Sequence, residues 1–234
     1  MAHPTRIPSM PPSFSLRVAL IAFLCALTAC ERPAAQTWPT GTAFALDGMP
    51  ITAEEIDVSA DIIAQLEPDS VTTQARRIAF TNIVLPRAAG ILAAGAERET
   101  ARKKAFELKR ELDGSATQPE PPSGVLLQDR VGVATDIGLE AWSHASTAPF
   151  GTWSDPIETV GAFEVVRVDE RSNANSARQV RYKVRVYFVP YLEPTSMRAS
   201  IEERLDRATL LFVDPTWAEI VPEALKHRLH AGAP

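Results

Sequence analysis

The chain has 234 residues, of which 45% are hydrophobic and 23% charged, and this is enough apolar material for one or two small packed domains. The formal net charge is −5, and it becomes about −7 when the first 29 residues, which hold two arginines and no acid, are set aside. An acidic chain has no electrostatic reason to bind nucleic acid, and anionic lipid surfaces repel it, so membrane attachment needs another cause.

The N-terminal segment predicts export and a lipid anchor. Residues 18–27 are a run of 10 apolar residues, which is too short to span a bilayer and typical of a signal peptide. The run ends in Leu27-Thr28-Ala29-Cys30, which resembles the lipobox of bacterial lipoproteins. That resemblance implies cleavage of residues 1–29, a diacylglyceryl group on the Cys30 thiol and attachment to an envelope membrane. The alternative is a plain secretory signal that is cleaved near Ala29.

The number and positions of the cysteines agree with a lipid anchor on Cys30. Cys25 lies inside the apolar run, so Cys30 is the only cysteine of the mature chain, and an intrachain disulfide is excluded even in an oxidising compartment. In such lipoproteins an Asp after the lipidated Cys favours retention in the inner membrane. Glu31 stands at that position, and the expected location is therefore the outer membrane, facing the periplasm.

A helical module is expected over residues 46–112, after a flexible tether over 30–45 that is rich in Pro and Thr and has no period. Thr52 and Glu55 have the spacing of a capping box, which starts a first helix that Pro68 ends. Residues 71–112 again have helical spacing, with a kink or break at Pro86, because proline has no N–H to donate. The mixed charges of its second half indicate a solvated face.

A Pro-rich linker over 113–123 predicts a domain boundary, followed by an α+β domain over 124–234. Asp136 is the expected cap of a short helix. Residues 163–168 and the alternating segment 180–188 are expected to form an antiparallel hairpin. A helix over about 195–207 follows, and 210–213 is either a short strand or a continuation of that helix. Asp214-Pro215 is expected to open a last helix to about residue 229.

Two segments carry a family resemblance. Leu46-Asp47-Gly48-Met49-Pro50-Ile51-Thr52 is similar to the opening of a periplasmic chaperone module. Phe150-Gly151-Thr152-Trp153-Ser154-Asp155-Pro156-Ile157-Glu158-Thr159, followed by Gly161 and Phe163-Glu164-Val165-Val166-Arg167-Val168, is similar to the closing segment of parvulins. Together they resemble the SurA/PpiC-type foldases, which join a helical chaperone module to parvulin peptidyl-prolyl isomerase domains. The implied fold is a SurA-like helical module followed by a parvulin-like antiparallel sheet with packed helices.

The resemblance also implies a substrate groove, with Trp153 and Phe163 as the aromatic wall of a proline pocket and Glu164 at the position of a family histidine. The family's first strand, which contains His-Ile-Leu-Val, has no counterpart between Leu112 and Phe150. In a rearranged order of the strands, residues 180–189 take the place of that first strand. The catalytic residues therefore stay unidentified.

Other chemistry receives less support. His227 and His230 favour charge at a helix end over metal binding, because no cysteine or acidic pair is close in sequence. Ser143, His144 and Asp155 are the components of a hydrolase triad, but the Gly-x-Ser-x-Gly elbow is missing and the glycines are too scattered for a phosphate loop. No metal and no cofactor are expected. The tryptophans expected in the core are Trp142, Trp153 and Trp217.

The sequence thus predicts a membrane-anchored envelope foldase or chaperone that binds unfolded or prolyl-containing segments of exported proteins, and an isomerase if it is catalytic. The alternative is a non-catalytic structural or assembly-factor lipoprotein with a degenerate parvulin-like fold. An open aromatic groove at Trp153 and Phe163 favours the first hypothesis. A groove filled by the protein's own side chains favours the second.

Overall fold

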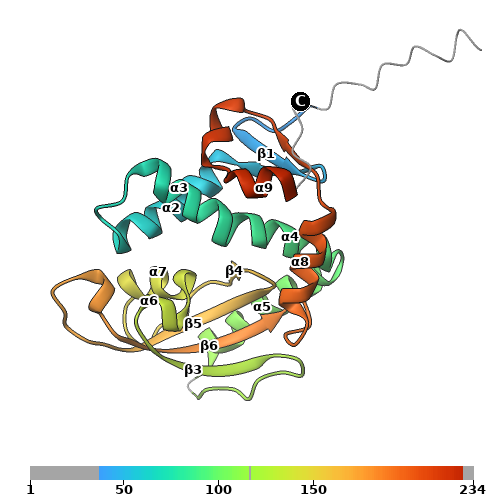
Figure 1. Cartoon of the computed structure of the whole chain (residues 1–234). Coiled ribbons are helices and arrows are strands. Elements are labelled where there is room, and N and C mark those ends of the chain that lie inside the picture. The colour runs from blue at the N-terminus through green and yellow to red at the C-terminus, as the bar shows by residue number, and fades with distance from the viewer. Residues whose placement is uncertain (1–36, 116, 229–234) are drawn as a thin grey trace, which may run out of the picture. The chain divides into compact units, whose positions relative to one another are not determined.

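A strand hairpin stands where the sequence predicted part of a tether. The computed structural model describes residues 37–115 and 117–228 (Figure 1), so the signal segment 1–29, Cys30 and residues 229–234 lie outside the described residues. Strands β1 (Thr42–Leu46) and β2 (Met49–Thr52) pair antiparallel. Asp47 and Gly48 join them with φ values of 47° and 83°, as in a type I′ turn. Strand β7 (Leu210–Phe212) pairs with the other edge of β1. All five residues of β1 are buried, and the tether prediction is therefore wrong for residues 42–45.

The helical stretch begins and breaks for local reasons. In helix α2 (Ala53–Leu66) the predicted capping box is present: the Glu55 N–H donates to Thr52 Oγ1 at 3.2 Å, and the Thr52 N–H donates to Glu55 Oε2 at 2.9 Å. Helix α3 (Thr72–Ala79) continues through the π-helical turn η1 (Phe80–Val84) into α4 (Leu85–Ala94), where the Leu85 N–H bonds the Phe80 carbonyl. The helix is thus not broken at Pro86, and the local irregularity is this widened turn, which ends at Val84, two residues before the proline. Helix α5 (Glu97–Gly114) follows.

A four-stranded antiparallel sheet makes up the second half, in the order β3-β6-β5-β4. Strands β5 (Ala162–Arg171) and β6 (Tyr182–Pro190) form the predicted hairpin. Strand β4 (Ile157–Thr159) pairs with β5, and β3 (Leu126–Gly132) pairs with β6 at the other edge. The sequence predicted no strand of the parvulin type between Leu112 and Phe150. The His-Ile-Leu-Val motif is indeed missing there, but strand β3 does lie in that interval. Its exposed Leu126 and Val131 obscure the alternation, because an edge strand is only partly covered.

The two faces of this sheet carry separate cores. On one face, helices α6 (Ala134–Ile137) and α7 (Leu139–Thr147) cover the sheet, and Trp142 is fully buried there. Asp136 caps α6 from its third position rather than from the N-cap, because its carboxylate accepts the Val133 N–H. On the other face lies α5. Its packed side chains and those of the sheet are Ala101, Ala105, Leu108, Leu112, Phe163, Val165, Tyr187, Val189 and Tyr191.

The C-terminal elements return to the first sheet. After the turn η2 (Ala177–Gln179) and β6 comes α8 (Met197–Arg207), which the periodicity predicted. Of residues 210–213, Leu210–Phe212 form strand β7 rather than a continuation of α8. The single last helix that was expected is instead a 3₁₀ turn, η3 (Pro215–Ile220), and a short helix, α9 (Glu223–Arg228). Pro222 separates them because it has no N–H for a continuous helix.

The two predicted modules are parts of one unit. Residues from Pro39 onward form a single compact unit. Its largest core joins Phe44, Phe80 and Leu85 to Ile201 and Leu210 from the other half of the chain. Segment 113–123 thus connects two parts of one body, and its Pro119 carbonyl accepts the Tyr187 hydroxyl at 2.6 Å.

Among the described residues, Thr72–Ala94 is long and apolar enough by composition to cross a membrane, and its buried side chains belong to the protein's cores.

Candidate functional site

The aromatic residues of the predicted groove lie beneath α5. The Gly151 N–H donates to the Val168 carbonyl and the Ser154 N–H to the Val166 carbonyl, which holds the Gly-x-Trp-Ser segment along β5. Trp153 thereby packs against Tyr187, with ring centres 5.2 Å apart, and under the Arg167 guanidinium at 5.0 Å. Phe163 is 4% exposed and meets the Tyr191 ring edge-on at 5.7 Å. The protein's own side chains fill this space.

Glu164 lies on the opposite face of the sheet, because successive side chains of a strand alternate between faces. It is 5% exposed, and its carboxylate accepts two bonds from Arg130, at 2.8 and 3.3 Å. Arg130 also donates to the Ile137 carbonyl at 2.9 Å, so the ion pair fastens the end of α6 to the sheet. The structure therefore does not bring Trp153, Phe163 and Glu164 together in one groove.

A different hollow opens between the helical layer and the four-stranded sheet, and we name it the interlayer groove. Figure 1 shows α2–α4 lying across the side of the sheet that carries α6 and α7. The groove has a volume of about 540 Å³. Its lining residues come from α2, η1 and α4 on one wall and from α7 and β4 on the other: Glu54, Glu55, Val58, Ser59, Ile62, Ile83, Arg87, Glu140, Ser143, His144, Thr147, Ile157 and Glu158.

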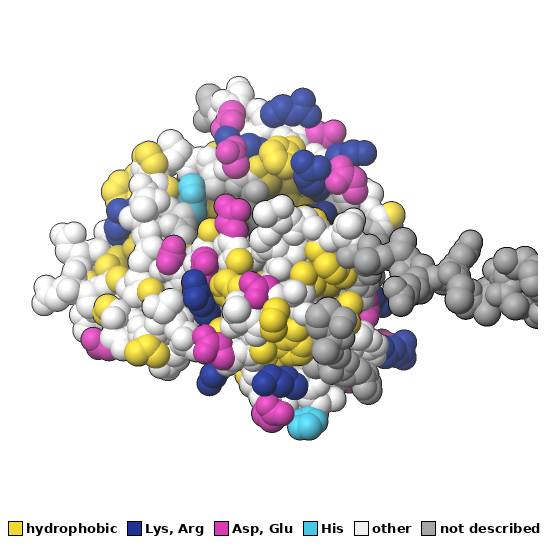
Figure 2. Space-filling model, turned by 90° about the horizontal axis from the view of Figure 1, so that it is seen from above, with side chains coloured by type: hydrophobic (Ala, Val, Ile, Leu, Met, Phe, Trp, Pro, Cys, Tyr) yellow, Lys and Arg dark blue, Asp and Glu magenta, His cyan; other side chains and the backbone are white. Residues whose placement is uncertain are grey.

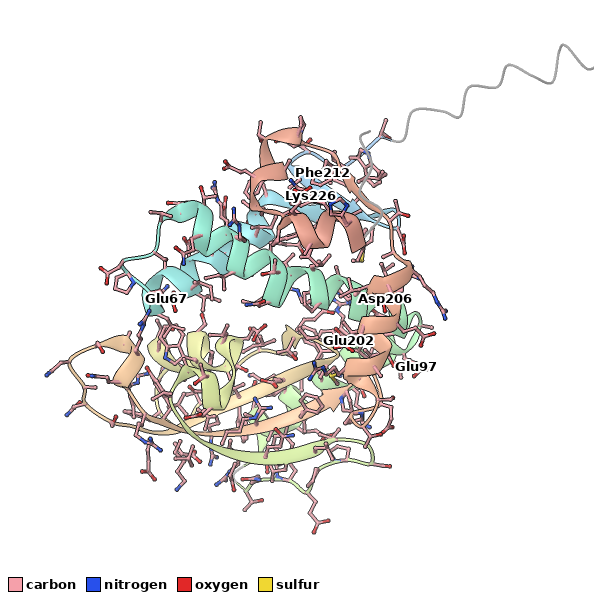
Figure 3. All side chains as sticks on the ribbon, in the orientation of Figure 1. Glu67, Glu97, Glu202, Asp206, Phe212 and Lys226 are labelled. Atoms are coloured by element: carbon pink, nitrogen blue, oxygen red, sulfur yellow. The ribbon has the colours of Figure 1, made fainter. Side chains whose placement is uncertain are left out.

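Two ion pairs stand beside this groove, and the second of them joins the helical layer to the sheet half. Arg98, at the start of α5, makes a bidentate pair with Glu158 of β4, at 2.6 and 2.7 Å. At the end of α2, Glu67 pairs with Arg178 of η2 at 3.2 Å, and Arg178 also donates to the Leu66 carbonyl. Figure 3 shows Glu67 at the end of α2 that is nearest the four-stranded sheet. Apolar packing joins the two walls as well, because Leu66 of α2 lies in the core under α6 and α7 and Leu139 of α7 packs against the α2–α3 core.

Burial shifts the pKa values of the two titratable groups that α7 places in the groove, Glu140 and His144. It raises the pKa of the Glu140 carboxyl, the nearby Glu164 adds to this rise, and Arg87 and Arg130 oppose it. Burial lowers the pKa of His144, against the opposing charge of Asp155. The His144 Nε2 atom is buried and has no hydrogen-bond partner among the described residues. The imidazole is therefore neutral at pH 7 and keeps one unsatisfied polar atom.

The groove combines apolar walls with carboxylates, and sequence reasoning had missed it. Val58, Ile62 and Ile83 on one wall face Ile157 on the other, while four glutamates and one arginine also line it. The Glu140-x-x-x-His144 spacing places both side chains on one helix face, and this was the available signal. In the described part of the chain, no group of three or more His, Cys, Asp or Glu is placed to hold a metal ion.

The residues considered for other chemistry do not converge. Ser143 and His144 both line the groove, but the Ser143 carbonyl accepts the Ser146 hydroxyl, and the structure gives no bond between Ser143 and His144. His227 lies on α9, 3.7 Å from Glu223, and His230 is outside the described residues. Figure 2 shows Lys and Arg interspersed with Asp and Glu over the viewed face rather than gathered in one patch.

Comparison with known proteins adds no family assignment: a scan against protein-family models, a search of curated proteins and a search of solved structures each found no match.

Proposed function

We propose that this chain is a non-catalytic envelope lipoprotein that holds a segment of another exported protein in the interlayer groove and so assists its assembly. One observation carries the proposal. The aromatic surface that the parvulin resemblance assigns to a prolyl substrate is occupied by Tyr187, Tyr191 and α5, whereas the interlayer groove is open. A concave site that combines apolar side chains with polar and charged groups is a common form of a binding site.

The anchoring part of the proposal rests on the leader and on Cys30. Lipidation is tested by metabolic labelling with palmitate and by fractionation of a Cys30→Ala variant. We expect label on the natural chain, none on the variant, and release of the variant from the membrane fraction. An unlabelled natural chain that fractionates like the variant contradicts the anchor.

The groove is tested with two matched photo-crosslinking positions. Val58 lies in the groove and is 57% exposed, while Val71 precedes α3 outside it and is 67% exposed. We expect exported proteins to crosslink to a photoreactive residue at position 58 and not at position 71. Equal crosslinking at both positions, or none at either, ends the proposal that this groove holds a segment of a client protein.

A second function, prolyl isomerisation, is favoured by one feature of the same groove. A neutral His144 and the carboxyl of Glu140 stand beside the apolar Ile157, a polar cluster next to an apolar wall. A prolyl isomerase lowers the amide rotation barrier, which is about 18–20 kcal/mol, by binding the twisted amide of the transition state most tightly. A prolyl-peptide assay at high protein concentration decides between the two functions. Acceleration that is lost in His144→Ala supports isomerisation, and no acceleration supports the non-catalytic protein.

A further inference from the structure

The charge of the interlayer groove indicates which segment it takes. Four glutamates and one arginine line it. Glu158 is held by Arg98, and Glu55 is held by the capping box of α2. Glu54 and Glu140 form no ion pair with any residue that the structure describes. Two carboxylates, one from each wall, thus face the groove without an ion-pair partner.

The surroundings make an added cation favourable. Water is partly excluded from Glu140, which is only partly accessible, and Glu164 stands behind it with the same charge. Arg87 and Arg130 offset this repulsion in part, but Arg130 is already bound to Glu164. A cationic side chain that enters the groove offsets the repulsion between the carboxylates and raises the stability of the ionised Glu140.

The apolar walls decide between a small cation and a peptide. Val58 and Ile62 on α2 and Ile157 on β4 flank the acidic positions, and a hydrated ion at the carboxylates would leave these apolar side chains uncovered. Apolar side chains on either side of a basic residue bury those walls while the charge reaches the carboxylates. An anionic ligand is opposed by the same glutamates.

We infer that the interlayer groove binds an extended protein segment in which a lysine or arginine stands between apolar residues, with the basic side chain between Glu54 and Glu140. This inference rests on the proposed function, and it adds the chemistry of the bound segment. Charge complementarity of this kind gives specificity and makes binding sensitive to salt.

The test uses the full chain in detergent and three fluorescent peptides that differ at one central residue: lysine, norleucine or glutamate, each between valine and leucine. We expect the lysine peptide to bind about tenfold more tightly than the norleucine peptide, because its ammonium group forms charge-assisted hydrogen bonds with the carboxylates, and the glutamate peptide to bind most weakly. Spermidine is measured beside them as a small cation without apolar side chains.

Variants separate the charge from the fold. Glu140→Gln and, independently, Glu54→Gln are each expected to reduce the preference for the lysine peptide over the norleucine peptide by about tenfold. Glu107→Gln is the control, because Glu107 is exposed on α5 at the other face of the sheet. Since Glu54 lies at an exposed helix start, its variant keeps the test valid if Glu140→Gln fails to fold.

The outcomes distinguish the inference from the proposed function. Equal affinities for the lysine and norleucine peptides, both lost in Val58→Asp, overturn the charge inference and leave the groove as a binding site. Tight spermidine binding without peptide binding overturns the inference in favour of a small cation. The absence of all peptide binding, together with equal crosslinking at positions 58 and 71, overturns the proposed function itself.

Discussion

The two faces of the four-stranded sheet differ in what covers them. On the α5 face, the helix packs directly on Phe163, Val165 and Tyr187, and a dry core results. On the other face, α6 and α7 cover the strands, and the next layer, α2–α4, meets α7 and β4 across the interlayer groove. The strands are therefore buried in a core on both faces, and the open, acidic hollow lies one layer further out, between α7 and α2. Aromatic residues on a strand do not by themselves indicate a binding wall.

The sharpest way to break this comparison is to truncate Phe163. If it is a core residue, Phe163→Ala leaves a cavity and lowers the free energy of unfolding by about 3–5 kcal/mol. Phe150→Ala is the control, because Phe150 is 59% exposed, and the loss of its contact with the Arg171 guanidinium is expected to change stability by no more than about 1 kcal/mol. Denaturant unfolding followed by Trp fluorescence measures both. A Phe163→Ala chain of unchanged stability would return Phe163 to the role of a substrate wall.

The stability of Glu164 variants tests the α7 face of the sheet in the same way. Glu164→Ala removes the partner of a mostly buried Arg130 and is expected to cost about 2–4 kcal/mol. The double variant Glu164→Leu/Arg130→Met is expected to be more stable than Glu164→Ala, because it leaves no uncompensated charge. The comparison of the two unfolding curves measures the coupling. If Glu164 is instead a site residue, its loss leaves stability unchanged and lowers peptide binding.

A substitution of Gly161 tests the turn between β4 and β5, at the edge of the sheet. Gly161 joins β4 to β5 with a φ of 81°, and a Cβ there would lie 2.5 Å from the Met197 sulfur. Gly161→Ala is therefore expected to cost about 1–3 kcal/mol and to displace β4, which carries Ile157 and Glu158 of the groove. The peptide affinity of this variant should fall with its stability. Gly114→Ala, where a Cβ meets nothing within 4 Å, is the control.

Particular residues show how much of this arrangement the sequence could predict. The alternation of 180–188 was enough to predict β6 and its hairpin with β5. Asp47-Gly48 between apolar residues is a strong hairpin signal, so β1–β2 was also predictable. Edge strand β3 was not, because its outward side chains include Leu126, Leu127 and Val131 and have no clear period.

The site was less accessible to sequence reasoning than the strands. The resemblance supplied Trp153, Phe163 and Glu164, but strand alternation and the packing of α5 decide where those side chains lie. The spacing of Glu140 and His144 on one helix face was visible in the sequence. Their opposite wall, Glu54 and Val58, is more than 80 residues away, and only the packing of α2 over α7 places it there.

The smallest expected effect is on the pH dependence of stability, to which His144 and Glu140 of α7 contribute with opposite signs. The folded-state pKa of His144 lies below its ordinary value of 6.5, so the unfolded chain takes up that proton first. The stability this group contributes is complete above about pH 6.5 and is lost as pH falls through the lowered pKa. For Glu140 the folded-state pKa is raised, so the folded chain takes up that proton first. Stability is therefore gained as pH falls through the raised pKa toward 4.5.

Each contribution is expected to be below about 1 kcal/mol, because both side chains are partly accessible and their charges are screened. His144→Gln should remove the loss on acidification and Glu140→Gln the gain, as measured by urea unfolding at a series of pH values. The charged and titratable groups that face them are unchanged in both variants: Glu54, Glu55, Arg87, Arg130, Asp155, Glu158 and Glu164. If both variants kept the pH profile of the natural chain, water would reach this wall freely, and α7 would present an ordinary exposed surface rather than one wall of a partly buried groove.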